Sequence, residues 1–291
     1  MTILVTGATG NVGRHVVAQL LEAGQPVRAL TRRPATANLP EGVEVVAGDL
    51  TKPEGLRSAF EGVDRLFLFP VAETAGEVVR MAREAGVRRV VVLSSVSAGY
   101  ESGDLSGDHH RAVEVVVEAS GLEWTHLRPG EFMANLLDWA PSIRSEGVVR
   151  APFPDEESNA VHEADIADVA VAALLDDGHA GRAYEVNGGE TLTRLEQVRV
   201  IAEVLGTEIR FEELTREQAR ELWVSEGMAP ELADWLLGTA QADGDGDEEW
   251  GEEWGEEESE PGPTCEAVTG RPPRSFAQWV ADHRDDFLPK S

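Results

Sequence analysis

The sequence predicts an α/β fold, with a doubly wound parallel sheet and a smaller, mostly helical C-terminal domain. Three observations support this. The chain has 291 residues, enough for one large and one small domain. Short apolar segments alternate with helical patterns through the first half. A glycine-rich turn, residues 7–13, separates the first apolar segment from the first helical pattern.

The elements of the first half follow in order. Residues 3–6 form the first predicted strand, and residues 14–21 form the first amphipathic helix. Five further strands are predicted at 27–31, 43–46, 66–69, 90–93 and 124–127, with helices between them, for example at 75–85 and 109–120. Repeated strand–helix–strand units predict a parallel sheet with helices on both faces.

The pattern changes after about residue 130. Helices are predicted at 164–176, 193–205, 216–225, 230–240 and 276–283, and one short strand at 183–186. We therefore expect a sheet domain over residues 1–130 and a smaller region over 131–240 and 264–291. In folds of this kind the cleft between sheet domain and smaller region holds the substrate.

Residues 241–263 form a low-complexity acidic segment, in which the tetrapeptide Glu-Glu-Trp-Gly occurs twice. Residues 241–260 alone hold 11 acidic residues and no basic one. Such a composition predicts a solvated, disordered insertion, and it leaves open a role in contacting a protein partner.

The same segment contains the start of a calcium-loop pattern. Asp243, Asp245 and Asp247 have the alternate spacing of the first ligands. However, Glu248 stands where the loop needs glycine, and Trp254 stands where it needs an acidic ligand. No metal site is predicted.

Composition narrows the function classes. The net charge is −29, and without residues 241–260 it is still −18, which argues against direct nucleic-acid binding. Cys265 is the single cysteine, which favours a reducing compartment. The first strand leaves no room for a signal peptide, and no apolar run approaches the roughly 20 residues of a membrane helix. We expect a cytoplasmic protein without membrane contact.

The glycine turn predicts a dinucleotide site. Gly7, Gly10 and Gly13 have the spacing G-x-x-G-x-x-G, which allows a tight turn and leaves backbone N–H groups aimed at a phosphate from a helix N-terminus. The alternative is a strand-to-helix turn without a ligand. The predicted phosphate contacts are Gly7, Thr9, Gly10, Asn11, Val12 and Gly13.

Two further positions bear on the choice of cofactor. Arg32 and Arg33 end the second strand, where a guanidinium pairs with the 2′-phosphate of NADP, so NADP(H) is favoured over NAD(H). The alternative for the two arginines is a solvated surface pair. Asp49, followed by Leu50, ends the third strand. Its carboxylate is expected either to accept from the adenine amino group or to cap the next turn.

These segments together resemble the NmrA-like group of atypical short-chain dehydrogenases. The resemblance spans nearly the whole chain except the acidic segment, and rests on residues 7–13, 32–34, 48–50, 92–95, 120–130, 132–135, 162–167 and 270–273. It implies a Rossmann-like NAD(P)-binding core and a small C-terminal domain. It also implies an NADPH-dependent quinone, azo-dye or phenylpropanoid-type reductase, or a redox sensor without turnover. Ser94 lies in one shared motif and is predicted to contact the cofactor.

The resemblance also locates the catalytic helix. Short-chain reductases use Tyr-x-x-x-Lys there. If Glu114 is taken as the glutamate four residues after the lysine, His110 stands at the lysine position and Ser106 at the tyrosine position. The Tyr/Lys pair is therefore missing, and Tyr100 lies six residues before the tyrosine position. His110 is the candidate to hold the nicotinamide ribose or donate a proton. The alternatives for His110 are a residue of the helix surface or a pair with Glu114, four residues further along the helix.

A missing Tyr/Lys pair is compatible with hydride transfer to a quinone-like acceptor, which is already electrophilic. Pro70 is predicted to shape the nicotinamide side of the site. Gly130, Phe132 and Asn135 are predicted to line the substrate cleft, although core packing of Phe132 and helix capping by Asn135 remain open. The leading prediction is an NADPH-dependent reductase of a small aromatic or quinone-like acceptor. The alternative is a non-catalytic NADP(H) sensor acting through a protein partner. A sugar-nucleotide epimerase is less favoured, because those enzymes retain Tyr and Lys.

Overall fold

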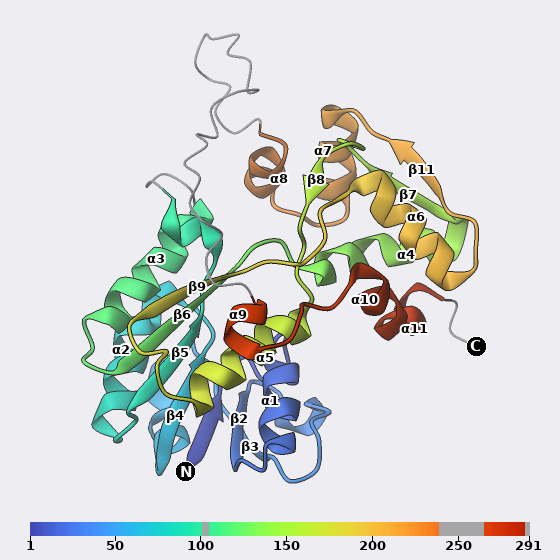
Figure 1. The fold of residues 1–291 in the computed structure, drawn as a ribbon. Helices are drawn as coiled ribbons and strands as arrows, with labels where there is room; N and C mark the ends of the chain where they lie inside the picture. Colours follow the sequence, from blue (N-terminus) through green and yellow to red (C-terminus); the bar gives the residue numbers. More distant parts are fainter. Residues whose placement is uncertain (101–104, 239–264, 289–291) are drawn as a thin grey trace. The chain divides into compact units, whose positions relative to one another are not determined.

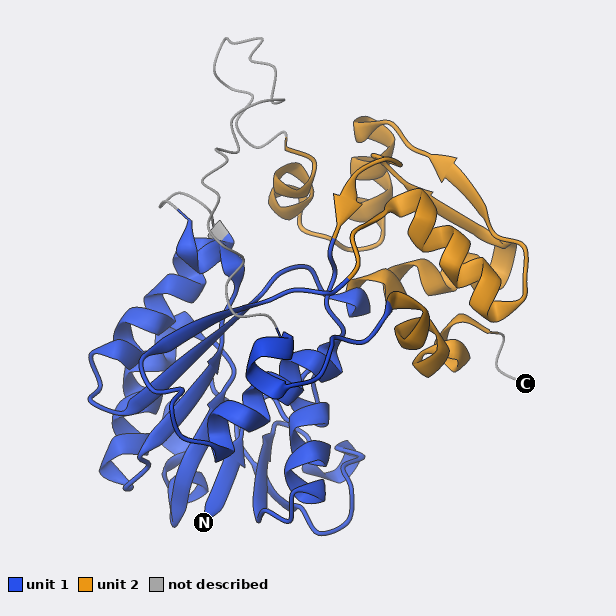
Figure 2. Cartoon of the chain, in the orientation of Figure 1, with its two compact units in different colours: residues 1–134, 159–189, 261–275 blue, residues 135–158, 190–260, 276–291 orange. Residues whose placement is uncertain are grey.

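The computed structural model describes residues 1–100, 105–238 and 265–288 (Figure 1). The chain divides into two compact units (Figure 2). The first unit comprises residues 1–134, 159–189 and 261–275, and the second comprises 135–158, 190–260 and 276–291. The acidic segment predicted at 241–263, with its calcium-loop pattern, lies outside the described residues.

A parallel sheet of seven strands forms the centre of the first unit, in the order β3-β2-β1-β4-β5-β6-β9. The strands are β1 (Thr2–Val5), β2 (Val27–Thr31), β3 (Glu44–Ala47), β4 (Val63–Leu68), β5 (Arg89–Leu93), β6 (Glu123–Pro129) and β9 (Arg182–Val186). The chain builds outward from β1 to β3 and then outward again from β4, so the strand order reverses between β1 and β4. This confirms the doubly wound sheet, and ligands in such sheets bind outside the carboxyl ends of the strands at the reversal.

Helices cover both faces of this sheet (Figure 1). The helices are α1 (Gly13–Glu22) and α5 (Glu163–Leu175) on one face, and α2 (Ala72–Glu84) and α3 (Leu105–Glu118) on the other, with α9 (Cys265–Thr269) against α5. Ile3 and Val5 point into the cluster with α1 and α5, whereas Leu4 points into the cluster with α2 and α3. This alternation along β1 is the period of two that a strand imposes. Short 3₁₀ helices lie at Pro34–Thr36, Pro53–Gly55, Arg57–Phe60 and Val96–Gly99.

The first unit extends beyond the boundary expected at residue 130. Strand β9 pairs in parallel with β6, with Tyr184 opposite Leu127, so it is the seventh strand of the main sheet. Helix α5 packs on α1 and buries Ile166 in the same apolar cluster. Residues 159–189 and the described part of 261–275 therefore belong with the sheet. The Ala/Val composition of α5 suits this place, because a helix that is apolar on most sides must be buried.

In its described residues, the second unit contains the helices predicted at 193–205, 216–225, 230–240 and 276–283, and four strands that the sequence did not predict. Its helices are Met133–Trp139 (3₁₀, beginning in the first unit), α4 (Ala140–Glu146), α6 (Arg194–Leu205), α7 (Arg216–Ser225), α8 (Pro230–Leu236), α10 (Phe276–Asp282) and α11 (Arg284–Phe287). β8 (Glu157–Ser158) and β10 (Leu192–Thr193) pair antiparallel, and β7 (Val148–Ala151) and β11 (Arg210–Glu213) pair in parallel. Strands of two to four residues are too short to show a clear alternation.

Capping boxes explain where two helices of the second unit begin. The Thr193 hydroxyl accepts from the N–H of Glu196, while the Glu196 side chain accepts from the N–H of Thr193. Thr215 and Gln218 form the same reciprocal pair before α7. Each pair satisfies backbone donors that the first helical turn leaves unpaired.

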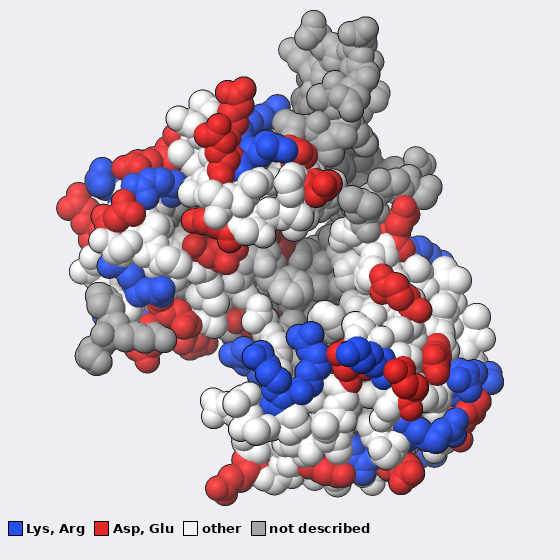
Figure 3. Space-filling view, turned by 180° about the vertical axis from the view of Figure 1, so that it is seen from behind, with Lys and Arg blue, Asp and Glu red and all other residues white. Residues whose placement is uncertain are grey.

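The surface carries charges of both signs. Acidic and basic side chains are interspersed over the face in Figure 3. In the part of the chain that the structure describes, no helix combines the length and the apolar character needed to cross a membrane.

Candidate dinucleotide-binding site

The glycine turn joins β1 to α1 and is shaped by close backbone contacts. Gly7 has a positive φ of 61°, a left-handed conformation that favours glycine. Its carbonyl oxygen accepts from the N–H of Gly10 at 2.9 Å. A Cβ on Gly13 would lie 2.2 Å from that same oxygen, so only glycine lets α1 start so close to the turn. The local geometry therefore requires glycine at Gly7 and Gly13.

The N-terminus of α1 suits an anion. Val12 is the N-cap residue, no side chain caps this end, and the first turn holds no acidic residue. The first N–H groups of a helix have no partner within the helix, and the helix dipole favours negative charge there. Thr9, Asn11 and Val12, three of the predicted phosphate contacts, lead directly into this end.

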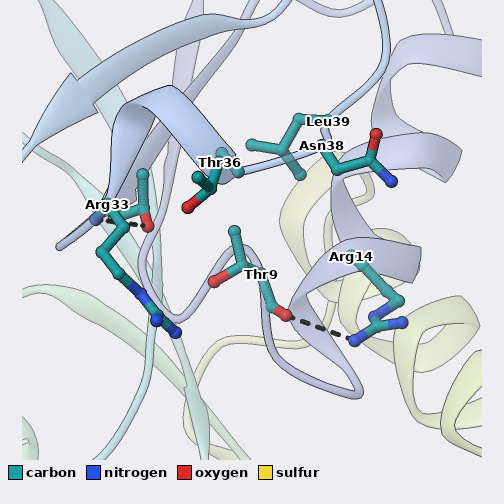
Figure 4. Close-up of a pocket in the computed structure, with 8 residues that line it drawn as sticks. Thr9, Arg14, Arg33, Thr36, Asn38 and Leu39 are labelled. Atoms are coloured by element: carbon teal, nitrogen blue, oxygen red, sulfur yellow. Dashed lines mark hydrogen bonds between the residues drawn. The ribbon is translucent and has the colours of Figure 1, made fainter.

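A pocket of about 300 Å³ lies beside the turn (Figure 4). Its walls come from the glycine turn, the start of α1, the end of β2 and the loop after β2: Thr9, Arg14, Thr31, Arg33, Thr36, Ala37, Asn38 and Leu39. The N–H of Arg33 donates to Thr31 Oγ1 at 3.2 Å, which fixes the start of the loop. Arg32 is exposed next to Arg33 and is not among the lining residues. Within the described residues, neither arginine forms an ion pair with a carboxylate.

Arg14 is a second guanidinium on this pocket and was not among the site residues predicted from the sequence. Its Nε donates to the carbonyl oxygen of Gly10 at 3.2 Å, and a terminal nitrogen donates to that of Thr9 at 3.4 Å. In the view of Figure 4, Arg14 and Arg33 lie to either side of Thr9. The sequence does contain one signal for Arg14. It places this cation in the first turn of a helix, where the positive end of the helix dipole makes a cation unfavourable. A bound anion would offset that cost.

Asp49 caps a turn, one of the two alternatives left open by the sequence. Its Oδ1 accepts from the N–H of Thr51 at 3.0 Å and from the Thr51 hydroxyl at 2.8 Å. These hydrogen bonds hold the pKa of Asp49 below its ordinary value. The neighbouring carbonyl of Leu50 accepts from the Thr74 hydroxyl of α2 at 2.7 Å. A contact between Asp49 and adenine would have to use its second oxygen.

The end of β4 lies beside the glycine turn. Thr6 is fully buried, and its hydroxyl donates to the carbonyl of Phe67 and accepts from the N–H of Phe69. Pro70, the predicted nicotinamide-side residue, is buried, whereas Phe69 is exposed. Phe69 was not among the predicted site residues, because the apolar run predicts a strand that includes it, whereas β4 ends at Leu68.

Ser94 is engaged in a buried polar network. Its hydroxyl donates to Oε1 of Glu114 at 2.7 Å. Arg128 binds the same carboxylate with two nitrogens, at 3.0 Å and 2.8 Å, and Arg111 donates to Oε2 at 3.0 Å. Burial alone would raise the pKa of Glu114, but the bonds from Arg128 and Ser94 outweigh it and lower the pKa to about 2. The predicted cofactor contact of Ser94 would therefore compete with its bond to Glu114.

His126 lies beside this network. It is buried, stacks on Trp124 with ring centroids 4.5 Å apart, and places Nε2 3.4 Å from Oε1 of Glu118. Burial lowers its pKa. Ligand atoms of Glu114, Glu118 and His126 lie within 4.8 Å of one another. Arg111 and Arg128 already bind these carboxylates, so the donor set is that of an ion-pair network rather than a cation site.

The predicted catalytic helix is α3. Ser106, at the tyrosine position, lies near the end of β5, where Ser97 Oγ is 3.4 Å from its hydroxyl and 2.9 Å from that of Ser95. His110 is partly exposed, one turn before Glu114, with its ring edge-on to His109 at 5.7 Å. The structure therefore places Ser106 in a serine cluster and His110 in a partly buried position on the same helix.

The three predicted cleft residues follow β6. A Cβ on Gly130 would lie 2.4 Å from the side-chain oxygen of Asn187, so a larger residue would displace that amide. Phe132 forms a parallel bridge with Val161 and packs partly against the apolar cluster of the first unit, in line with core packing. Asn135 is exposed and begins the second unit.

The chain is similar to known NAD(P)H-dependent proteins. A family model described as NAD(P)H-binding matches residues 7–177. The chain is 41% identical over 293 residues to (4-alkanoyl-5-oxo-2,5-dihydrofuran-3-yl)methyl phosphate reductase of Streptomyces griseus, covering 99% of this chain and 100% of the relative. It is 33% identical over 292 residues to an NAD(P)H azoreductase of Xenophilus azovorans, covering 98% and 99%.

A solved structure shares the fold. The NADPH-dependent quinone oxidoreductase of Escherichia coli, complexed with NADPH, is 26% identical and has a TM-score of 0.75, covering 96% of this chain and 99% of that one. The glycine turn lies inside the matched family region. The chain therefore belongs to an NAD(P)H-binding family of oxidoreductases, which resembles the atypical short-chain dehydrogenases.

Proposed function

We propose that the protein is a reductase that uses NADPH to transfer a hydride to a small, electron-poor aromatic or quinone-like acceptor. The observation that carries the cofactor choice is the pocket beside the glycine turn, which has Arg33 and Arg14 among its walls. A guanidinium matches phosphate geometry with paired N–H donors. NADH has no 2′-phosphate to meet these cations.

The residues divide the work of binding. The backbone N–H groups at the start of α1 would hold the pyrophosphate, and Arg33, with Arg14 and the exposed Arg32, would hold the 2′-phosphate. Thr6 fixes the ends of β1 and β4 against each other through hydrogen bonds of 3.0 Å to Phe67 and 2.7 Å to Phe69. The bound cofactor supplies the hydride, and the protein supplies its orientation.

The predicted lack of a Tyr/Lys pair favours an acceptor that needs little acid catalysis. Conjugated, electron-poor rings accept a hydride without prior protonation by a strong acid. The relatives' names refer to azo compounds, a quinone and an alkanoyl-oxo-dihydrofuran phosphate. We assign His110 as the candidate proton donor after hydride transfer.

The test combines binding and turnover. Purified protein is titrated with NADPH, and then a quinone, an azo dye and an alkanoyl-oxo-dihydrofuran phosphate are added while absorbance of the reduced cofactor is followed. We expect binding and oxidation with at least one acceptor class. Tight binding without oxidation across the panel would favour the NADP(H) sensor instead.

His110→Ala and the matched variant His109→Ala test the proton donor. We expect a lower kcat for His110→Ala with an unchanged KM for NADPH, and little change for His109→Ala. Unchanged turnover in His110→Ala removes that residue from catalysis.

A further inference from the structure

Phe69 is an exposed aromatic residue at the point where the strand order of the sheet reverses. It directly follows β4, which pairs with β1 in the middle of the sheet. Its exposed fraction is 43%, whereas Leu68 and Pro70 on either side are buried. A large apolar side chain left open at this edge lies where open α/β sheets bind their ligands.

Thr6, the residue directly after the neighbouring strand β1, holds the backbone of Phe69 in place. Its N–H donates to Thr6 Oγ1 at 2.7 Å, and the same hydroxyl donates to the carbonyl of Phe67 at 3.0 Å. The N–H of Thr6 also donates to that carbonyl at 3.0 Å. These hydrogen bonds join the end of β4 to the end of β1, so the backbone that carries the exposed ring has a fixed position.

The ring lies against the glycine turn. A Cβ on Gly7 would lie 3.1 Å from Cβ and 3.2 Å from Cδ2 of Phe69, so the glycine leaves the space that the aromatic side chain occupies. One side of the ring is thus covered by the turn while a large part of the side chain stays open to solvent.

The two halves of a dinucleotide lie on opposite sides of the strand reversal. Arg33, at the end of β2, marks the adenosine side. The end of β4 is on the other side of β1 in the strand order. A dinucleotide bound across the reversal would place its nicotinamide nucleotide on that side. Resting on the proposed function, we infer that Phe69 is the aromatic wall that contacts the nicotinamide half of the cofactor.

The test separates the two halves of the cofactor. Binding of NADPH and of 2′,5′-ADP, which lacks the nicotinamide nucleotide, is measured for the wild type, Phe69→Ala, Phe69→Leu and Phe69→Trp. Because an aromatic ring stabilises a stacked base, Phe69→Ala should weaken NADPH binding roughly tenfold and leave 2′,5′-ADP binding within about twofold of the wild type. Phe69→Trp should retain NADPH affinity, and Phe69→Leu should fall between.

Arg33→Ala is the matched control, because it should weaken both ligands. Equal losses for NADPH and 2′,5′-ADP in Phe69→Ala, or no loss at all, would overturn the inference. A wild-type protein that fails to bind NADPH would instead overturn the proposed function. The melting temperature without ligand checks folding, and we expect it to change little because the side chain is largely exposed.

Discussion

A Cβ placed on Gly13 would lie 2.2 Å from the carbonyl oxygen of Gly7 and 2.8 Å from its carbonyl carbon. The first turn of α1 therefore rests directly on the backbone of the glycine turn. A side chain at this position forces the helix N-terminus away from the turn, because backbone atoms cannot move aside as a flexible side chain can. The phosphate contacts proposed for the turn depend on that close approach.

Gly13→Ala is expected to weaken NADPH binding more than tenfold and to lower the melting temperature, since the variant must separate α1 from β1. Gly76→Ala is the matched control. Gly76 is exposed in α2 with open space where a Cβ would go, so alanine should be neutral there or stabilise the helix by up to about 1 kcal/mol. Equal NADPH affinity in Gly13→Ala and Gly76→Ala would contradict the close packing of the turn.

Glu114 should make the protein sensitive to acid. Its ordinary pKa of 4.5 is lowered to about 2 in the folded protein, chiefly because the bonds from Arg128 and Ser94 outweigh the effect of burial. A lowered folded pKa contributes stability that is complete above about pH 4.5 and is lost as the pH falls towards about 2. The contribution is on the order of 3 kcal/mol.

Urea unfolding of Glu114→Gln checks this prediction. The variant should be destabilised near neutral pH, because Arg128 loses a charged partner, and its stability should fall less steeply with acid than that of the wild type. Glu84→Gln removes an exposed carboxylate that pairs with Arg80 and should leave the acid profile close to that of the wild type. Parallel profiles for the wild type and Glu114→Gln would show that the network does not lower the pKa of Glu114.

Cys265 is expected to be unreactive in the native protein. Burial raises its pKa to about 11 and outweighs the opposing hydrogen bond from Thr269, so little thiolate is present at neutral pH. A thiol reagent should label the native chain slowly and the urea-unfolded chain rapidly, at one site. Fast labelling of the native protein would contradict the buried position of this side chain.

The parts of the site that depend on local sequence were predictable. Gly7 and Gly13 specify a turn whose geometry only glycine allows. Arg33 is the second residue after β2, so its place at the edge of the sheet follows from the strand assignment. Asp49 shows the limit of such reasoning. Both an adenine contact and a turn cap fit its sequence context, and only the bonds to Thr51 show that it caps the turn.

The remaining features depend on contacts between distant segments. Phe69 lies against Gly7 because β4 pairs with β1, and Glu114 meets Arg128 because α3 packs beside β6. Residues 159–189 also belong to the first unit and supply β9, the seventh strand of its sheet. The change of sequence pattern at residue 130 predicted instead that the sheet domain ends there. The spacing of apolar residues within a segment predicts its secondary structure but does not predict which distant segment it contacts.

The NADPH site at the glycine turn is tested most directly by equilibrium titration of the wild type and of the double variant Arg32→Ala with Arg33→Ala, using NADPH and NADH. The wild type should bind NADPH more tightly, and the double variant should lose more than tenfold of its affinity for NADPH while its affinity for NADH changes less than about threefold. Equal losses for the two cofactors, or a wild type that binds NADH as tightly as NADPH, would contradict the assignment of these arginines to the 2′-phosphate.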